Sequence, residues 1–166
     1  MEKIRKATTD DHQAIIDIYN QAVEDGLRTA DTEFVTLDSS RKWLEGHLDD
    51  LHPIFVCTIG GQLAGWVSIS AYRPGRRALR FTKEVSSYVH RDYRGRGIGS
   101  KLLEHTIDYS RKKGIKNIFA ILLETNTPSI RVLEKFGFAR WGHLPRVAVF
   151  NGKEVGQYYY GKRIAD

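Results

Sequence analysis

The sequence predicts one domain of the α+β class, built on a largely antiparallel sheet that helices cover. Three observations support this class. Helix-like and strand-like periodicities follow one another in the order β-α-α-β-β-β-α-β-α-β-β, which gives seven strands. The turn sequences Gly60-Gly61 and Asn151-Gly152 each join two strand-like segments, as in antiparallel hairpins. One helical segment between two apolar strands, residues 98–113, predicts a single crossover between parallel neighbours.

The first half of the chain contains three predicted strands and two predicted helices. Residues 4–7 form a short strand, and the polar cluster 8–10 supplies N-cap oxygens for the helix that follows. A second helix is predicted from Asp38 to about Leu48, where apolar residues are spaced three and four apart. The hairpin strands are 54–59 and 63–72. The apolar face of the first helix consists of Ile15, Ile16, Ile18, Tyr19, Ala22 and Val23.

The second half contains the remaining four strands and two helices. Residues 79–90 are extended and lead into a segment rich in glycine and arginine, residues 91–100. The next helix runs to about residue 113, with Gly114 as its left-handed C′ residue. The later elements are a buried strand at 117–123, a helix from Asn126 to about Phe136 with Pro128 in its first turn, and the hairpin strands 140–150 and 155–162.

The composition is that of one ordinary folded protein. A chain of 166 residues with 41% hydrophobic and 28% charged residues is neither disordered nor fibrous in type. Cys57 is the single cysteine, so an internal disulfide is excluded, and its apolar surroundings place it in the core. No apolar stretch approaches the roughly 20 residues of a membrane helix, and the N-terminus lacks the apolar core of a signal peptide. We therefore expect a cytoplasmic protein.

The net charge of +6 raises the question of nucleic-acid binding. Most basic residues are dispersed, and neither an aromatic stacking platform nor a recognition helix accompanies them, which disfavours such a partner. A basic surface also suits a ligand that carries several phosphates.

A candidate phosphate-binding loop lies between the fourth strand and the third helix. Residues 94–99, RGRGIG, have the spacing R-x-x-G-x-G, and glycine lets main-chain N–H groups at a helix N-terminus approach an anion closely. A dinucleotide-binding loop would follow the first strand of a parallel sheet, whereas four strands precede this one. A Walker A lysine is also absent. The alternative interpretation is a flexible turn, and the context of the loop in the rest of the sequence must distinguish the two.

Six motifs follow one another along nearly the whole chain: IRKA at 4–7, IYNQAV at 18–23, EVSSYVH at 84–90, RGRGIG at 94–99, NTPSI at 126–130 and EKFGF at 134–138. This series resembles the GNAT acetyltransferases and, among them, the phosphinothricin acetyltransferase-like branch. The resemblance implies one GNAT domain over residues 1–166. It also implies a seven-stranded sheet with helices on both faces, in which the strand before the glycine-rich loop bulges and splays away from the strand that follows.

By the same resemblance, acetyl-CoA is the acetyl donor and lies in the splay. The main chain near Tyr88 pairs with pantetheine, and an N–H group there polarises the thioester carbonyl. The loop holds the pyrophosphate, and no metal is expected. Sheet packing at Tyr88 and Val89, a helix cap at Asn126 and a structural role for Ser129 are the alternatives. The expected cofactor-binding residues are Tyr88, Val89, His90, Arg94, Gly95, Arg96, Gly97, Ile98, Gly99, Ser100, Asn126 and Ser129.

Acetylation needs a neutral amine, so a group must accept its proton. Glu84 is the candidate base, because it lies on the strand that leads to the cofactor segment and holds the glutamate of the branch's E-x-S-x-Y-V pattern. Its alternative is a surface glutamate, or one paired with Arg80 or Lys83. Leu133 stands where the family has a tyrosine or histidine that protonates the leaving thiolate, so no general acid is assigned. His90 and His143 are expected to be structural or surface residues rather than acids, although His90 lies within the cofactor segment.

The acceptor is expected to be a small amino-acid-like primary amine of the phosphinothricin, methionine sulfone or methionine sulfoximine type, attacking directly in a ternary complex. Arg76 and Arg77 could attract its acidic group, beside Glu84 and Ser86. Residues 30–33 match the branch, whereas residues 149–155 lack its tryptophan and aspartate, which puts phosphinothricin specificity in doubt. A protein N-terminal or lysine acetyltransferase and a catalytically silent acyl-CoA-binding module are the alternatives. A homodimer is a further expectation.

Overall fold

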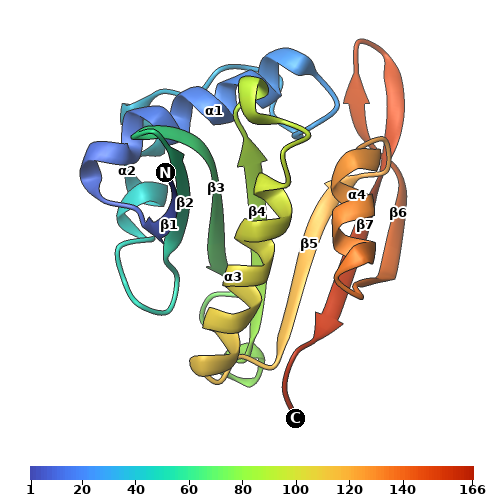
Figure 1. Ribbon diagram of the computed structural model, residues 1–166. Coiled ribbons are helices and arrows are strands. Elements are labelled where there is room, and N and C mark those ends of the chain that lie inside the picture. Colours follow the sequence, from blue (N-terminus) through green and yellow to red (C-terminus); the bar gives the residue numbers. More distant parts are fainter.

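The computed structural model describes residues 1–166 as a seven-stranded sheet with four α-helices (Figure 1). Short 3-10 helices occur at Thr9–Asp11, Arg77–Leu79 and Arg91–Tyr93. The strands are β1 (Glu2–Lys6), β2 (Ile54–Ile59), β3 (Gln62–Ala71), β4 (Thr82–Val89), β5 (Asn117–Leu123), β6 (Ala139–Phe150) and β7 (Lys153–Arg163). The helices are α1 (His12–Asp25), α2 (Leu37–Glu45), α3 (Ile98–Lys112) and α4 (Thr127–Lys135). None of these helices is long and apolar enough to cross a membrane.

The order of strands in the sheet is β1-β2-β3-β4-β5-β7-β6, and every neighbouring pair is antiparallel except β4 and β5. β4 and β5 pair only from Thr82, opposite Asn117, to Glu84, opposite Phe119. Beyond this point β4 remains paired with β3 as far as Val89. The expected fold class and the expected splay are thus confirmed. The register of β4 on β3 is continuous, so the strand splays without the bulge that the resemblance implied.

Helices cover both faces of the sheet, as predicted. α3 and α4 pack on one face, where Leu102, Ile107 and Leu133 belong to a core of 15 buried residues. Figure 1 shows α3 across β3 and β4, with α4 over β5 and β7 on the same side. α1 and α2 pack on the other face around Trp66, which donates a hydrogen bond from Nε1 to the carbonyl of Ile15 at 3.1 Å. Cys57 is fully buried, as expected.

Several predicted boundaries differ from the structure by one to three residues, and three of them have a clear physical reason. β1 begins two residues earlier than predicted, because Glu2 and Lys3 continue the pairing with β2. α2 ends at Glu45 rather than near Leu48, because Gly46 follows and glycine is a poor helix former. β4 begins at Thr82 rather than at residue 79, because Arg77–Leu79 forms a 3-10 turn before it.

The turn predictions are confirmed by the backbone angles. Asn151 and Gly152 have φ values of 49° and 80°, as a type I′ hairpin between β6 and β7 requires. Gly114 has a φ of 73° just after α3. Both turns need the left-handed region, which explains the residue types found there.

The N-terminus of α2 is held by a capping box. Thr36 Oγ1 accepts a hydrogen bond from the Ser39 N–H at 3.0 Å, and Ser39 Oγ accepts one from the Thr36 N–H at 2.9 Å. Thr36→Ala should therefore lower the free energy of unfolding by about 1 kcal/mol. Denaturant titration checks this value. Thr32→Ala, in the exposed loop before the cap, serves as the control, and an equal loss in both variants would contradict a capping role.

Candidate active site

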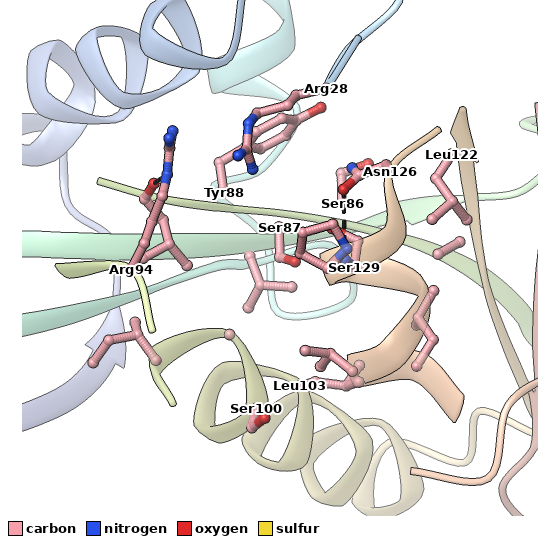
Figure 2. Close-up of a pocket in the computed structure, with 18 of the residues that line it drawn as sticks. Arg28, Ser86, Ser87, Tyr88, Arg94, Ser100, Leu103, Leu122, Asn126 and Ser129 are labelled. Carbon is pink, nitrogen blue, oxygen red and sulfur yellow. Dashed lines mark hydrogen bonds between the residues drawn. The ribbon is translucent and has the colours of Figure 1, made fainter. Parts of the chain in front are cut away.

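The divergence of β4 and β5 opens a cavity of about 520 Å³ that reaches both faces of the sheet. Leu103 of α3 and Leu133 of α4 line it on one face. Ile18 of α1 and Arg28 of the following loop line it on the other. Figure 2 shows this arrangement, with Arg28 and Tyr88 on one side and Ser100 and Leu103 on the opposite side. Two molecules can therefore approach one point in the sheet from opposite faces.

The direction of the main-chain groups of β4 follows from its register. The His90 N–H donates to the carbonyl of Ala64 at 2.9 Å, so the directly opposed residues 90 and 64 form a hydrogen-bonded pair. Such pairs alternate along antiparallel strands, which places Tyr88 in the next one, opposite Trp66. The N–H and C=O groups of Ser87 and Val89 consequently face the splay. Just before the strand, the Phe81 carbonyl accepts a hydrogen bond from the Lys116 N–H at 2.9 Å. This contact likewise shows that the main-chain groups of odd-numbered residues point toward β5.

The glycine-rich loop forms one end of the cavity. Gly95 and Gly97 have φ values of 74° and 77°, and nothing lies within 4 Å of a Cβ atom built on either one. Gly97 is the N-cap of α3, so the unpaired N–H groups of the first helical turn face open space. Ile98 is 1% exposed, and its side chain anchors the loop in the core while its main chain borders the cavity.

Ten of the twelve residues expected to bind the cofactor line the cavity, and two do not. His90 accepts a hydrogen bond at Nδ1 from the Asp92 N–H at 3.2 Å and so caps the following 3-10 turn. Arg96 is exposed and lies over the ring of Tyr93, 5.3 Å from its centroid. The ten lining residues are Tyr88, Val89, Arg94, Gly95, Gly97, Ile98, Gly99, Ser100, Asn126 and Ser129.

Asn126 and Ser129 combine a structural role with a place at the cavity. Asn126 is the N-cap of α4, and its Oδ1 accepts a hydrogen bond from the Ser129 N–H at 3.4 Å. Both residues line the cavity across from β4, as Figure 2 shows. Leu133 follows on the same helix, and it presents only hydrocarbon where related enzymes are expected to carry an acid.

Glu84 lies on the face of β4 that α1 and α2 cover, together with Ser86 and Tyr88. Burial raises the pKa of its carboxyl group above the usual value of 4.5. Neither of the expected cations pairs with it. Arg80 lies over the Phe81 ring, and Lys83 points to the opposite face, where its Nζ contacts His52 Nε2 at 2.9 Å.

The position of Glu84 along the strand sets how it could act. Ser86 and Tyr88 line the cavity, but Glu84 lies beyond its wall. Four residues of extended chain span about 13 Å, so a proton from an amine near Tyr88 would need a water bridge to reach the carboxylate. Ser70 lies opposite Glu84 on β3, and its hydroxyl contacts His47 Nε2 at 3.0 Å.

An aromatic group supports the cavity wall on the α1 side. The ring of Tyr88 meets Tyr19 edge-on, with centroids 5.0 Å apart, and lies 4.9 Å from Trp66. The Tyr19 hydroxyl contacts Thr29 Oγ1 at 2.7 Å and donates to Asp31. Burial raises the pKa of both tyrosines, so both hydroxyls stay protonated, and that of Tyr19 ties the loop between α1 and α2 to α1.

Sequence reasoning missed Arg28, which belongs to this loop. Its Nε lies 3.2 Å from Asp25 Oδ2, and the same carboxylate contacts Arg94 at 2.7 Å. Arg76 and Arg77 are exposed in the segment before β4 and line neither of the two main hollows of the surface. The polar character of residues 26–36 pointed to a cleft border, but no periodic pattern singled out Arg28. No group of three or more His, Cys, Asp or Glu side chains is placed to hold a metal ion.

Two relatives are similar to this chain over most of their length. An L-methionine sulfoximine/L-methionine sulfone acetyltransferase of Salmonella typhimurium is 33% identical over 150 residues, which are 90% of this chain and 87% of the relative. A phosphinothricin N-acetyltransferase of Streptomyces viridochromogenes is 30% identical over 86% of this chain and 76% of the relative.

Solved structures share the whole fold. The protein yncA from Salmonella typhimurium, solved with its cofactor acetyl-CoA, superimposes with a TM-score of 0.92 at 30% identity, over 99% of this chain and 95% of that one. A ribosomal-protein-alanine N-acetyltransferase from Brucella melitensis gives a TM-score of 0.90 at 32% identity, over 97% and 99% of the two chains. The sequence profile of the Acetyltransferase (GNAT) family matches residues 13–138. With the splayed sheet and the glycine loop in place, this chain belongs to the GNAT acetyltransferase family and uses acetyl-CoA as its donor.

Proposed function

We propose that this enzyme transfers the acetyl group of acetyl-CoA to the primary amine of a small amino-acid-like acceptor, by direct attack in a ternary complex. One observation carries the proposal. The cavity of the splay has main-chain donors of Ser87 and Val89 on its wall, a glycine loop at one end and access from both faces of the sheet. A thioester that enters from one face and an amine that enters from the other can therefore meet at the same point.

The proposed reaction uses these groups in order. The pyrophosphate lies on the N–H groups of residues 94–100, and the pantetheine extends along β4 as an added strand would. An N–H group beside Tyr88, that of Ser87 or Val89, donates to the thioester oxygen as negative charge develops there. The amine nitrogen attacks the carbonyl carbon, the C–S bond breaks, and the amide forms as CoA leaves as a thiolate.

Proton transfer is assigned to Glu84 and water. The ionised Glu84 accepts the proton of the amine through a bridging water, which leaves the nitrogen lone pair free to attack. The thiolate takes its proton from solvent, because Leu133 cannot donate one.

The alternative acceptor is a protein N-terminus or lysine. Similarity to the ribosomal-protein-alanine N-acetyltransferase supports it. A small acidic acceptor is favoured because Arg28 and Arg94 line the cavity and, together with Arg91, surround Asp25 at the end of α1. A silent acyl-CoA-binding module is the third possibility, and Leu133 is the feature that supports it.

A thiol-release assay with acetyl-CoA separates the three. The first panel contains L-methionine sulfone, L-methionine sulfoximine, phosphinothricin and the common amino acids, and the second contains short peptides with free N-termini or lysines. Release of CoA with the first panel supports the proposal. Release with peptides alone supports the alternative acceptor, and measurable acetyl-CoA binding without release in either panel supports the silent module.

We also propose that the enzyme works in the cytoplasm as a homodimer. The edge strand β6 exposes Trp141, Leu144, Val147 and Val149, at 53%, 36%, 53% and 60%, and an exposed apolar edge strand is a ready surface for pairing. The single thiol, Cys57, is compatible with a reducing compartment.

Introducing charge at this edge should break the dimer. In light scattering at about 100 µM, above the roughly micromolar dissociation constant of a moderate interface, the wild type should have the mass of a dimer. The double variant Val147→Lys/Val149→Lys should have that of a monomer, whereas Leu48→Lys, at a residue 58% exposed beyond α2, should remain dimeric. A monomeric wild type would exclude the dimer.

A further inference from the structure

Arg28 and Arg94 are the two cations that line the main cavity, and both pair with Asp25 at the end of α1; Arg28 is the one that lies outside the glycine loop. It lines the main cavity with Tyr88 and Asn126, and it also borders a smaller hollow next to it. We propose that Arg28 binds the carboxylate of the acceptor and thereby makes the enzyme selective for amino acids over simple amines. This inference rests on the proposed acetyl transfer to a small amine, and it names the residue that makes the enzyme selective for that amine.

The loop around Arg28 is held on both sides, which fixes where its side chain begins. Thr125 Oγ1 donates a hydrogen bond to the carbonyl of Leu27 at 3.5 Å. Thr29 Oγ1 contacts the Tyr19 hydroxyl at 2.7 Å. Because both neighbours of Arg28 are tied to elements of the cavity wall, its side chain starts at the opening, as Figure 2 shows.

The contacts around Arg28 are compatible with an additional anion. Asp25 is shared by Arg28, Arg91 and Arg94, at 3.2, 3.6 and 2.7 Å, and Glu24 pairs only with Arg91. Three guanidinium groups thus share two carboxylates by direct contact, and Asp31 of the same loop is bound by the Tyr19 hydroxyl instead. The contact of Arg28 with Asp25 is made by Nε, so its two terminal nitrogens can present a fork to a carboxylate.

The geometry of an amino acid decides between Arg28 and the other candidate arginines. In an α-amino acid the carboxylate and the amine are attached to the same carbon, so the group that binds the carboxylate must lie at the reaction point itself. Arg76 and Arg77 precede β4, whereas the cavity adjoins its other end, from residue 85 to residue 89. Of the two arginines that line the cavity, Arg94 belongs to the glycine loop expected to hold the pyrophosphate, which leaves Arg28 for the acceptor.

The test compares two acceptors that differ only in the carboxylate, L-methionine sulfone and 3-(methylsulfonyl)propan-1-amine. Arg28→Gln should raise the KM for the amino acid about 10- to 100-fold, the usual effect of losing a hydrogen bond to a charged group, and should change the KM for the simple amine less than about twofold. The KM for acetyl-CoA should be unchanged. Arg28→Lys, which keeps the charge without the fork, should fall between the two.

Arg41→Gln is the matched control, because Arg41 also pairs with an aspartate three residues earlier, at 3.0 Å, but on the exposed surface of α2. An equal effect of Arg28→Gln on both acceptors, a raised KM for acetyl-CoA, or a selective effect of Arg76→Gln instead would overturn the assignment. A wild type that acetylates only the simple amine would also overturn it, while leaving acetyl transfer intact. A wild type that acetylates neither compound nor any other amine contradicts the proposed function itself.

Discussion

Glu84→Gln is expected to lower kcat about 100-fold or more, while the dissociation constant for acetyl-CoA stays unchanged. Glutamine keeps the size of the side chain but cannot take a proton from the amine. Glu84 lies outside the cavity that would hold the donor, so its removal should not disturb donor binding. Steady-state kinetics with saturating acetyl-CoA gives kcat, and calorimetry gives the affinity. Glu104→Gln, on the exposed side of α3, is the matched control.

The pH dependence provides a second measurement on the same variant. A base must be ionised to act, so wild-type activity should fall as the pH decreases through the pKa of Glu84, which burial raises above 4.5. The activity of Glu84→Gln should lack this decrease at acidic pH and should follow only the titration of the acceptor amine. Wild-type rates in Glu84→Gln, or an unchanged decrease at acidic pH, would remove Glu84 as the base.

Stability should change in the opposite direction to activity. A folded-state pKa above the unfolded value means that the folded protein binds the proton of Glu84 more tightly, so the ionised group costs stability once the pH exceeds that pKa. Glu84→Gln should therefore unfold at a higher temperature than the wild type at pH 7, and the difference should disappear below about pH 4. A half-buried carboxylate without a cationic partner lowers stability, as expected of a group that is kept for catalysis.

The fold was predictable because its signals are local. The hairpin turns at Gly60-Gly61 and Asn151-Gly152 require left-handed backbone angles, and glycine and asparagine are the residues that favour such angles. The crossover helix α3 has an apolar stripe bounded by Gly97 and Gly114. The splay of β4 from β5 has no such local signal, and only the resemblance to a family indicated it.

The candidate site was predictable in its residues but not in its directions. A strand has two faces and two edges, and a shift of one residue exchanges them. The sequence could therefore place Tyr88 at the cavity without showing that the main-chain groups facing the splay are those of Ser87 and Val89. Only the pairing of His90 with Ala64 fixes the alternation.

The acceptor side was the least predictable part. Charge density pointed to Arg76 and Arg77, but density along the sequence does not show which end of a strand a loop occupies. Arg28 stands in a loop without periodicity, and its position depends on contacts of Thr29 and Leu27 with residues distant in the sequence. The sequence indicated that an arginine would bind the acidic group of the acceptor, but only the tertiary contacts show which arginine lies at the cavity.

Gly97→Val is expected to weaken acetyl-CoA binding about 10- to 100-fold, the effect of losing a hydrogen bond to a charged group. Gly97 has a φ of 77° at the N-terminus of α3, and the space beside it, which a diphosphate would share, is open. A valine there fills that space and also resists the left-handed conformation, at a cost of about 1–2 kcal/mol. The effect of backbone strain in Gly97→Val must therefore be distinguished from the effect of blocking the diphosphate.

Gly75→Val makes that separation possible, because Gly75 has a φ of 78° and equally open surroundings, but lies in the exposed loop before β4. Both variants should lose similar stability in thermal unfolding. Only Gly97→Val should lose affinity for acetyl-CoA in calorimetric titration. The pantetheine part of CoA, which lacks the diphosphate, should bind Gly97→Val and the wild type equally well. Equal affinity of both variants for acetyl-CoA would place the diphosphate away from this turn, and with it the thioester that the splay is proposed to align.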